Sequence, residues 1–153
     1  MARGGTHAGL LAGIQHFGDD TAVVGVNVTP YDDVEMRRKI LRNVHQANDE
    51  LDVDLEEIET RIDIRSGYLG PGYATPSEDD LRTIVEVGSK EGLVLDTCYT
   101  AKAFRCFLEE AEPGATNLFV HTGGSYGLFP LREQVRRAVA KFGSSEGDES
   151  STF

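Results

Sequence analysis

The stretch TAVVGVNVTPYDDVEM, residues 21–36, passes from an apolar run rich in β-branched residues directly into the start of a helix. The run over residues 21–28 predicts a strand. Thr29 is a preferred N-cap residue and Pro30 suits the first helical position, and two aspartates follow in the first turn. We therefore expect a helix from Pro30 to Asn48, joined to the strand by a short turn.

Similar apolar runs and helix starts alternate along the rest of the chain, which is the pattern of an α/β fold. We expect a three-layer architecture, with an open and mainly parallel sheet and flanking helices. TPSE, residues 75–78, has the T-x-x-E form of a capping box and begins a helix that Gly92 should end. The other expected strands are Arg61–Ile64 and Asn117–His121, and the other expected helices are Thr6–His16, Tyr99–Glu110 and Leu131–Phe142.

The composition is that of a small acidic globular protein. The chain has 153 residues, 39% of them hydrophobic, and a formal net charge of −11. The acidic excess argues against binding of nucleic acid, because phosphate backbones are held by clustered lysine and arginine. No segment approaches the ~20 apolar residues of a membrane span, so we expect a cytoplasmic protein that binds neither membranes nor nucleic acid.

Three further features indicate structure rather than chemistry. Cys98 and Cys106 have no neighbouring ligand pair, so buried reduced thiols are expected instead of a metal or redox site. The acid-rich run over residues 49–59 lacks the glycine and the alternation of a calcium loop, which favours a solvated turn and helix over a metal site. The tail, residues 143–153, is rich in serine, glycine and acid and should be disordered.

A glycine-rich turn near the start of the sequence has the properties of a phosphate cradle. Gly4 and Gly5 let a backbone approach a ligand closely. The helix expected to follow directs its unpaired N–H groups and the positive end of its dipole at the same place, and Thr6 adds a hydroxyl. Taken alone, such a turn can equally be a tight connection.

Two later turns place polar groups beside expected helices or strands. At Tyr99 and Thr100 an apolar run gives way to a helix, although Thr100 could equally cap that helix while Tyr99 packs. At His121 an expected strand ends in a glycine-rich turn, which is where open α/β sheets bind ligands. His121 alone would more often be structural than a base. A fourth segment, the turn-rich loop 67–73, could present Tyr73 to a cleft.

In this order and spacing, four segments together closely resemble the C-terminal half of the D-cysteine desulfhydrase / 1-aminocyclopropane-1-carboxylate deaminase family. That family consists of pyridoxal-phosphate enzymes with the tryptophan-synthase-β-like fold, or fold type II. The resemblance implies that residues 1–142 are a C-terminal cofactor-binding portion with part of that fold, and that the cofactor is pyridoxal 5′-phosphate. The segments are GGTHAGLLAG (4–13), GYLGPGYATPSEDDL (67–81), EGLVLDTCYTAKAF (91–104) and NLFVHTGGSYGLF (117–129).

The resemblance also implies roles for single residues. The glycine-rich turn would hold the cofactor phosphate, and Thr100 would face the pyridine nitrogen. Tyr99 and Tyr73 match tyrosines of the family's active site, and the HTGG turn would close the far side of the cofactor pocket. The implied catalytic residues are Tyr99 and Tyr73, and the implied cofactor-binding residues are Gly4, Gly5, Thr6, His7, Thr100, His121, Thr122 and Gly123.

The identity of residue 100 bears on the type of reaction. A carboxylate there could keep the pyridine nitrogen protonated, which a neutral hydroxyl cannot do comparably. The deaminases resemble this chain but carry glutamate at that position, so Thr100 fits the desulfhydrase branch better. The chemistry implied is removal of an α-proton and β-elimination from a small amino acid such as D-cysteine, which gives pyruvate, ammonia and sulfide.

Pyridoxal chemistry needs a lysine that forms a Schiff base, and in this family that lysine lies in the N-terminal half. Two interpretations therefore stay open. The chain is part of an active enzyme, either as a fragment or by pairing with a separate N-terminal lysine-bearing half, or it is a non-catalytic remnant that binds the cofactor phosphate or another anion. We expect the chain alone to be inactive, and complete relatives suggest a homo-oligomer. None of the four lysines, Lys39, Lys90, Lys102 and Lys141, matches the family's Schiff-base motif.

Overall fold

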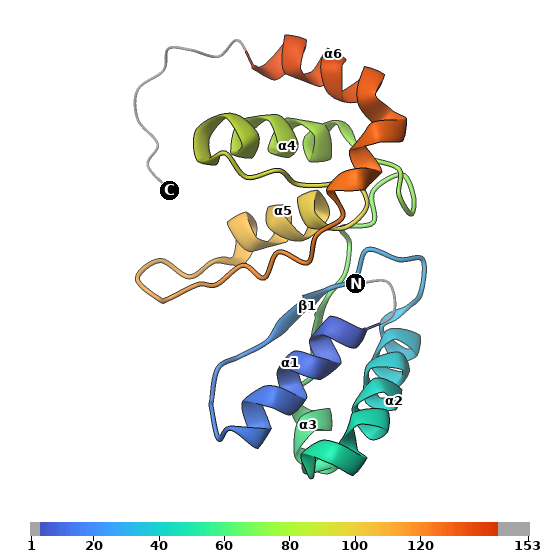
Figure 1. Cartoon of the computed structure of the whole chain (residues 1–153), viewed down its shortest axis with the longest axis vertical. Coiled ribbons are helices and arrows are strands. Elements are labelled where there is room, and N and C mark those ends of the chain that lie inside the picture. Colours follow the sequence, from blue (N-terminus) through green and yellow to red (C-terminus); the bar gives the residue numbers. More distant parts are fainter. Residues whose placement is uncertain (1–3, 144–153) are drawn as a thin grey trace. The chain divides into compact units, whose positions relative to one another are not determined.

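The computed structural model describes residues 4–143 of the chain, and Figure 1 shows its helices and strands. Two compact units, Met1–Tyr73 and Ala74–Phe153, are called here the first unit and the second unit. The first unit contains α1 (Gly5–His16), β1 (Val24–Val26), α2 (Asp33–Leu51), α3 (Leu55–Arg61) and β2 (Asp63–Arg65). The second unit contains α4 (Glu78–Glu91), α5 (Thr100–Glu110), the 3₁₀ helix η1 (Ser125–Leu131) and α6 (Arg132–Phe142).

The two strands of the first unit pair in parallel, with Val24 opposite Asp63 and Val26 opposite Arg65. The Asn27 amide extends the pairing by donating a hydrogen bond to the Arg65 carbonyl at 2.8 Å. Parallel strands need a long crossover connection, and α2 and α3 supply it between β1 and β2. The predicted α/β class, with helices and parallel strands, is confirmed.

The helix predicted from Pro30 to Asn48 is present as α2, but it begins and ends three residues later. Its cap is Asp32, whose side chain accepts a hydrogen bond from the Glu35 amide at 2.8 Å. Thr29, the predicted cap, is already used elsewhere, because its hydroxyl donates to the Asn27 side chain.

The capping box of α4 also lies two residues after the predicted one. Ser77 accepts a hydrogen bond from the Asp80 amide at 3.1 Å, and the Asp80 carboxylate accepts one from the Ser77 amide at 2.8 Å. Asp80 therefore has the role in the capping box that the sequence pattern predicted for Glu78. The predicted end is correct, since Gly92 follows the helix with the left-handed φ of 66°.

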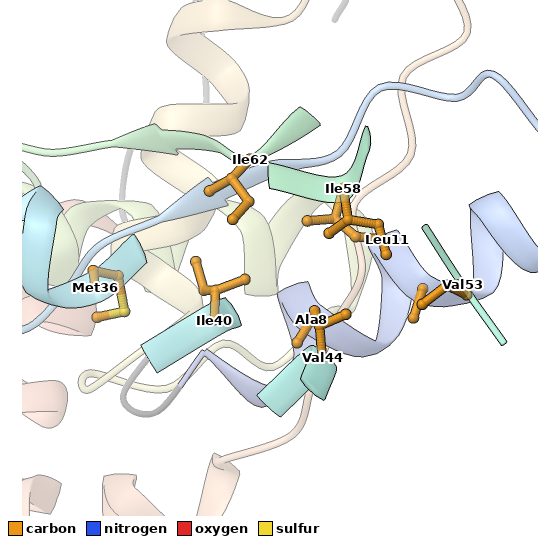
Figure 2. Close-up of a cluster of buried hydrophobic side chains, with 9 residues drawn as sticks. Ala8, Leu11, Met36, Ile40, Val44, Val53, Ile58 and Ile62 are labelled. Atoms are coloured by element: carbon orange, nitrogen blue, oxygen red, sulfur yellow. The ribbon is translucent and has the colours of Figure 1, made fainter. Parts of the chain in front are cut away.

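The core of the first unit lies between α1, α2 and α3, and Figure 2 shows its side chains. α1 and α2 each contribute residues three or four positions apart, which places them on one face of each helix. α3 adds Ile58, which is fully buried. The cluster consists of Ala8, Leu11, Ala12, Met36, Ile40, Val44, Val53, Ile58 and Ile62.

Replacing Ile58 with alanine should lower the free energy of unfolding by about 2–5 kcal/mol, because the lost methylenes leave a cavity in this core. Urea unfolding followed by circular dichroism measures the loss. Val34→Ala is the matched control, since Val34 is 68% exposed on α2. Its effect should stay within about 0.5 kcal/mol. Equal losses for the two variants would contradict the assigned core.

The second unit has a smaller core of aromatic and aliphatic side chains, to which α4 and α5 both contribute. Phe104 of α5 packs edge-to-face on Phe119, with ring centroids 4.9 Å apart. The segment Asn117–His121, which we expected to be a strand, has no regular secondary structure and pairs with no strand among the described residues. Phe119 is partly buried by this ring packing, whereas Leu118 and Val120 on either side of it are exposed. The described sheet thus has two strands instead of the three expected.

Several smaller expectations can be compared with the structure. Both cysteines are free thiols, but only Cys106 is buried, whereas Cys98 is partly exposed. The acid-rich run forms the end of α2, a turn and most of α3, as predicted. The predicted disordered tail lies, apart from Gly143, outside the described residues. Within residues 4–143 no helix is long and apolar enough to cross a membrane.

Candidate functional site

The predicted site residues divide between the two units, and each group is described within its own unit. The first unit carries the glycine-rich turn, residues 4–7, and Tyr73. The second unit carries Tyr99, Thr100 and the turn at residues 121–124.

Gly4 is the N-cap residue of α1, and its backbone has the left-handed φ of 72°. A Cβ at this position would also lie 2.8 Å from the Ile40 side chain, a distance that real contacts do not reach. Both the conformation and the space therefore require glycine. The core helix α2 sets this requirement, because Ile40 belongs to the buried cluster.

The N-terminus of α1 is open to an anion. No side chain caps it and its first turn has no acidic residue. The Ala8 amide bonds to the Gly4 carbonyl at 2.9 Å, while the amides of Gly5, Thr6 and His7 have no partner among the described residues. Gly5 and Thr6 are exposed, and a Cβ on Gly5 would meet nothing within 4 Å. Free amides, the helix dipole and open space fit a phosphate group.

The His7 ring is buried in the first unit, with 1% of the residue exposed. Neither ring nitrogen has a hydrogen-bond partner among the described residues. Burial lowers the pKa of His7 to about 4, and the negative charge of Asp63 opposes this only in part. The ring is therefore neutral at pH 7, and only the backbone amide of His7 belongs to the open helix end.

His7 should make the protein less stable as the pH falls from 6.5 towards 4. In that range the unfolded chain protonates the histidine, while the folded chain, whose His7 pKa is about 4, does not. The shift corresponds to a loss on the order of 3 kcal/mol. Urea unfolding at pH 7.5 and pH 4.5 should show a smaller difference for His7→Leu than for the wild type.

The control for this comparison is His45→Leu, because His45 is exposed on α2. It should keep the wild-type difference in stability between the two pH values. An unchanged pH dependence in His7→Leu would show that His7 is not the group that resists protonation.

Tyr73 lines a cavity of about 510 Å³ in the first unit and is 45% exposed. Two basic side chains, Lys39 and Arg42, line the same cavity. The Lys39 ammonium lies 4.3 Å from the Tyr31 ring centre and 3.3 Å from the Glu35 carboxylate. The cavity therefore combines phenols with positive charge. Its lining is Thr29, Pro30, Tyr31, Lys39, Arg42, Asn43 and Tyr73, so it does not include the glycine-rich turn.

In the second unit, the start of α5 is built around Asp96, which we had not predicted to have a role. Its carboxylate is fully buried. It accepts hydrogen bonds from the amides of Cys98, Tyr99 and Thr100 and from the Thr100 hydroxyl. The aspartate therefore caps α5, and Thr100 is itself buried at the first helical position. Tyr99 is half-buried and precedes the helix.

The HTGG turn lies against the same carboxylate. A Cβ on Gly124 would come within 2.7 Å of the Asp96 side chain, and Gly124 has a left-handed φ of 100°. The Gly123 amide donates to His121 Nδ1 at 3.1 Å, so Nε2 carries the ring hydrogen and donates to the Val94 carbonyl at 3.0 Å. Both nitrogens of His121 are engaged, which supports its structural role. The structure thus brings Thr100 and this turn together through Asp96.

Lys102, two residues after Thr100, is fully buried and fixed in place. Its ammonium donates to the Thr75 carbonyl at 3.0 Å and lies 3.6 Å from the Asp80 carboxylate. Asp80 also pairs with Arg105 at 3.0 Å. The lysine therefore balances a buried charge of the second unit, and this fits its lack of match to a Schiff-base motif.

Removing the Asp80 carboxylate should lower the stability of the protein more than removing the Lys102 charge. Asp80→Ala leaves Lys102 buried without its counter-ion and breaks the capping box of α4, so a loss of about 3–5 kcal/mol is expected. Lys102→Met leaves Asp80 paired with Arg105 and should lose less. Thermal and urea unfolding of the two variants give the order. The reverse order would contradict this account of the buried group.

Comparisons with known proteins show that the chain is similar to proteins named as deaminases of 1-aminocyclopropane-1-carboxylate (ACC) and as D-cysteine desulfhydrases. A Thermotoga maritima protein, provisionally named as a 1-aminocyclopropane-1-carboxylate deaminase, is 43% identical over 140 residues, which is 91% of this chain. D-cysteine desulfhydrase of Yersinia pestis is 33% identical over 136 residues, or 86% of the chain. A crystal structure of an ACC deaminase homologue matches 90% of the chain with a TM-score of 0.78 and 30% identity.

These relatives are considerably longer than the matched region. The chain spans 43% of the Thermotoga protein, 40% of the Yersinia enzyme and 42% of the solved structure. No family model matches the chain. The resemblance predicted from the four motifs is confirmed, and the chain shares the fold of the part of the solved homologue that it matches.

Proposed function

Because this chain is related to the D-cysteine desulfhydrase / 1-aminocyclopropane-1-carboxylate deaminase family over most of its length, we propose that it is the cofactor-binding portion of a pyridoxal-phosphate-dependent lyase. The observation that carries the proposal is the open start of α1. The amides of its first turn have no hydrogen-bond partner among residues 4–143, and Gly4 is required by the core beneath it. Such an end binds a phosphate monoester well.

We assign the phosphate of pyridoxal 5′-phosphate to the amides of Gly5, Thr6 and His7, with the Thr6 hydroxyl as a further donor. In the second unit we assign the cofactor ring to Thr100 and to the turn His121–Gly123. When bound, the cofactor withdraws electrons from the α-carbon of an amino acid.

The side chains proposed to move protons are Tyr99 and Tyr73. A phenol acts as a base at neutral pH only beside a positive charge or the cofactor. Tyr73 lines the same cavity as Lys39 and Arg42. Tyr99 directly precedes Thr100, so it is held next to the residue assigned to the ring.

The reaction we propose is β-elimination from a small amino acid such as D-cysteine. The α-proton and the thiol group leave, and hydrolysis of the product with one water gives pyruvate and ammonia beside the sulfide. Threonine at position 100 supports this branch of the family over the deaminase branch. The Schiff-base lysine would come from a lysine-bearing half, either in the same polypeptide or in a separate one, and a homo-oligomer in the cytoplasm is proposed for the complete enzyme.

A second candidate belongs to a different class, a non-catalytic domain that binds the cofactor phosphate or another anion. Any anion could satisfy the amides at the N-terminus of α1, with or without a reaction. In addition, the buried Lys102 is unsuited to forming a Schiff base. If the chain binds pyridoxal phosphate, both candidates remain and a purely structural role for the turn is excluded. Turnover with the lysine-bearing half separates them from each other.

A bulky residue at Gly5 should weaken binding of pyridoxal phosphate far more than one at Gly13. Both glycines lie in α1, and a Cβ on either would meet nothing within 4 Å, so both variants should fold. Only Gly5→Leu places a side chain over the free amides. Titration of each purified variant with pyridoxal phosphate, followed by cofactor fluorescence, gives the dissociation constants. Equal effects would mean that the turn is merely structural.

The same preparations allow a test of activity. The chain alone should release no sulfide from D-cysteine, because none of its lysines matches the family's Schiff-base motif. Clear turnover by the chain alone would contradict the proposed need for a lysine-bearing half.

A further inference from the structure

The cavity of about 510 Å³ in the first unit is lined by segments that follow both parallel strands. Tyr31 lies in the loop after β1, and Tyr73 lies in the segment after β2. α2 adds Lys39 and Arg42, which are three positions apart and therefore neighbours on one face of the helix. Open α/β sheets bind ligands outside the carboxyl ends of their strands. The volume is also within the range of about 300–1,000 Å³ that is usual for small-molecule sites.

The loop wall of this cavity is held in shape by the first unit itself. The buried Asn27 side chain donates a hydrogen bond to the Tyr31 carbonyl at 2.8 Å. Its side-chain oxygen accepts hydrogen bonds from the Thr29 amide at 3.1 Å and from the Thr29 hydroxyl at 2.7 Å. The loop therefore needs no ligand to adopt this shape, and a site formed in advance loses less free energy on binding.

Lys39 is also held in place at the cavity. Its ammonium lies 4.3 Å from the centre of the Tyr31 ring and 3.3 Å from the Glu35 carboxylate. A cation over a phenol ring is attracted by the electrons of the ring face. Glu35 offsets part of the lysine charge, so Lys39 contributes less than one full positive charge to the cavity.

Arg42 differs from the other described arginines of the first unit. Each of the others contacts a carbonyl or carboxylate oxygen, whereas Arg42 has no hydrogen bond or ion pair with any residue in 4–143. A guanidinium presents a planar fork of N–H donors that matches a carboxylate. Although the chain is acidic, it thus leaves an unpaired cation at this cavity. The paired arginines are Arg37, Arg38, Arg61 and Arg65.

We propose that this cavity binds a small aromatic carboxylate, with its carboxylate on Arg42 and Lys39 and its ring against Tyr31 and Tyr73. The phenol rings supply flat apolar surface on which an aromatic ring packs. Because Glu35 offsets part of the positive charge, a singly charged carboxylate suits the cavity better than a doubly charged phosphate. The inference goes beyond the proposed function and does not depend on it, since the cavity lies within the first unit and excludes the glycine-rich turn.

The test is a titration of the purified chain with 2-naphthoate, a fluorescent aromatic carboxylate. We expect saturable binding, and we expect 2-naphthamide, which has the same shape without the charge, to bind about tenfold or more weakly. Two-dimensional ¹⁵N NMR locates the ligand. The backbone amides of Tyr31, Lys39 and Arg42 should shift, while those of Gly5 and Thr6 should not.

Variants of single lining residues test the assigned contacts. Arg42→Met and Lys39→Met should each weaken 2-naphthoate binding by about tenfold or more, because each removes a charged donor. Tyr73→Phe keeps the ring and should bind like the wild type, whereas Tyr73→Ala should bind more weakly. The matched control is Arg38→Met, which removes the same charge from the same helix. Arg38 does not line the cavity, and its side chain is 63% exposed, so this variant should keep the wild-type affinity.

Three results would overturn the inference. Equal weakening by Arg38→Met and Arg42→Met would mean that the anion is attracted to the charge of α2 in general. Shifts at Gly5 and Thr6, with binding lost in Gly5→Leu, would place the anion at the start of α1 instead. Tighter binding of 2-naphthyl phosphate than of 2-naphthoate would contradict the choice of a carboxylate. Failure of the chain to bind pyridoxal phosphate, in contrast, would overturn the proposed function and leave this inference intact.

Discussion

The buried carboxylate of Asp96 has to be satisfied by hydrogen bonds, because an unpaired charge in a protein interior is costly. The chain meets this need with the amides of the turn that starts α5 and with the Thr100 hydroxyl. Meeting it fixes where α5 begins and how Thr100 points. It also restricts residue 124 to glycine. The geometry assigned to the cofactor ring in the second unit thus depends on one side chain that would not touch the ring.

In the first unit, the N-termini of the helices differ in how they are capped. An aspartate side chain caps the N-terminus of α2 and of α3, whereas the N-cap residue of α1 is a glycine and no side chain caps that helix. Glycine in place of a capping side chain costs about a few tenths of a kcal/mol of helix stability. That cost is consistent with an end kept free for a ligand, since a bound phosphate would satisfy the same amides. Core packing keeps the end in place, because Gly4 lies directly on Ile40.

Local chemistry made much of this structure predictable from sequence. Caps, turn glycines and apolar spacing located the helices to within about three residues, the usual uncertainty of such boundaries. The strand expected at Asn117–His121 is absent because an apolar run forms a strand only beside a partner strand, and among the described residues this segment has none; its Phe119 packs on other rings instead. Asp96 and the buried Lys102 were missed for a related reason. Nothing local distinguishes a buried charge from a solvated one until the tertiary contacts exist.

The role of Thr100 illustrates what residue identity alone leaves out. From sequence, a hydroxyl in place of a carboxylate implied weaker stabilisation of a protonated ring nitrogen. In the structure its hydrogen is already given to Asp96, so the same residue can only accept. Asp96, and not the threonine itself, therefore decides whether the Thr100 hydroxyl can donate a further hydrogen bond. Since Asp96 lies just four positions earlier, the pair D-x-x-x-T is the unit that a sequence comparison of such enzymes should examine.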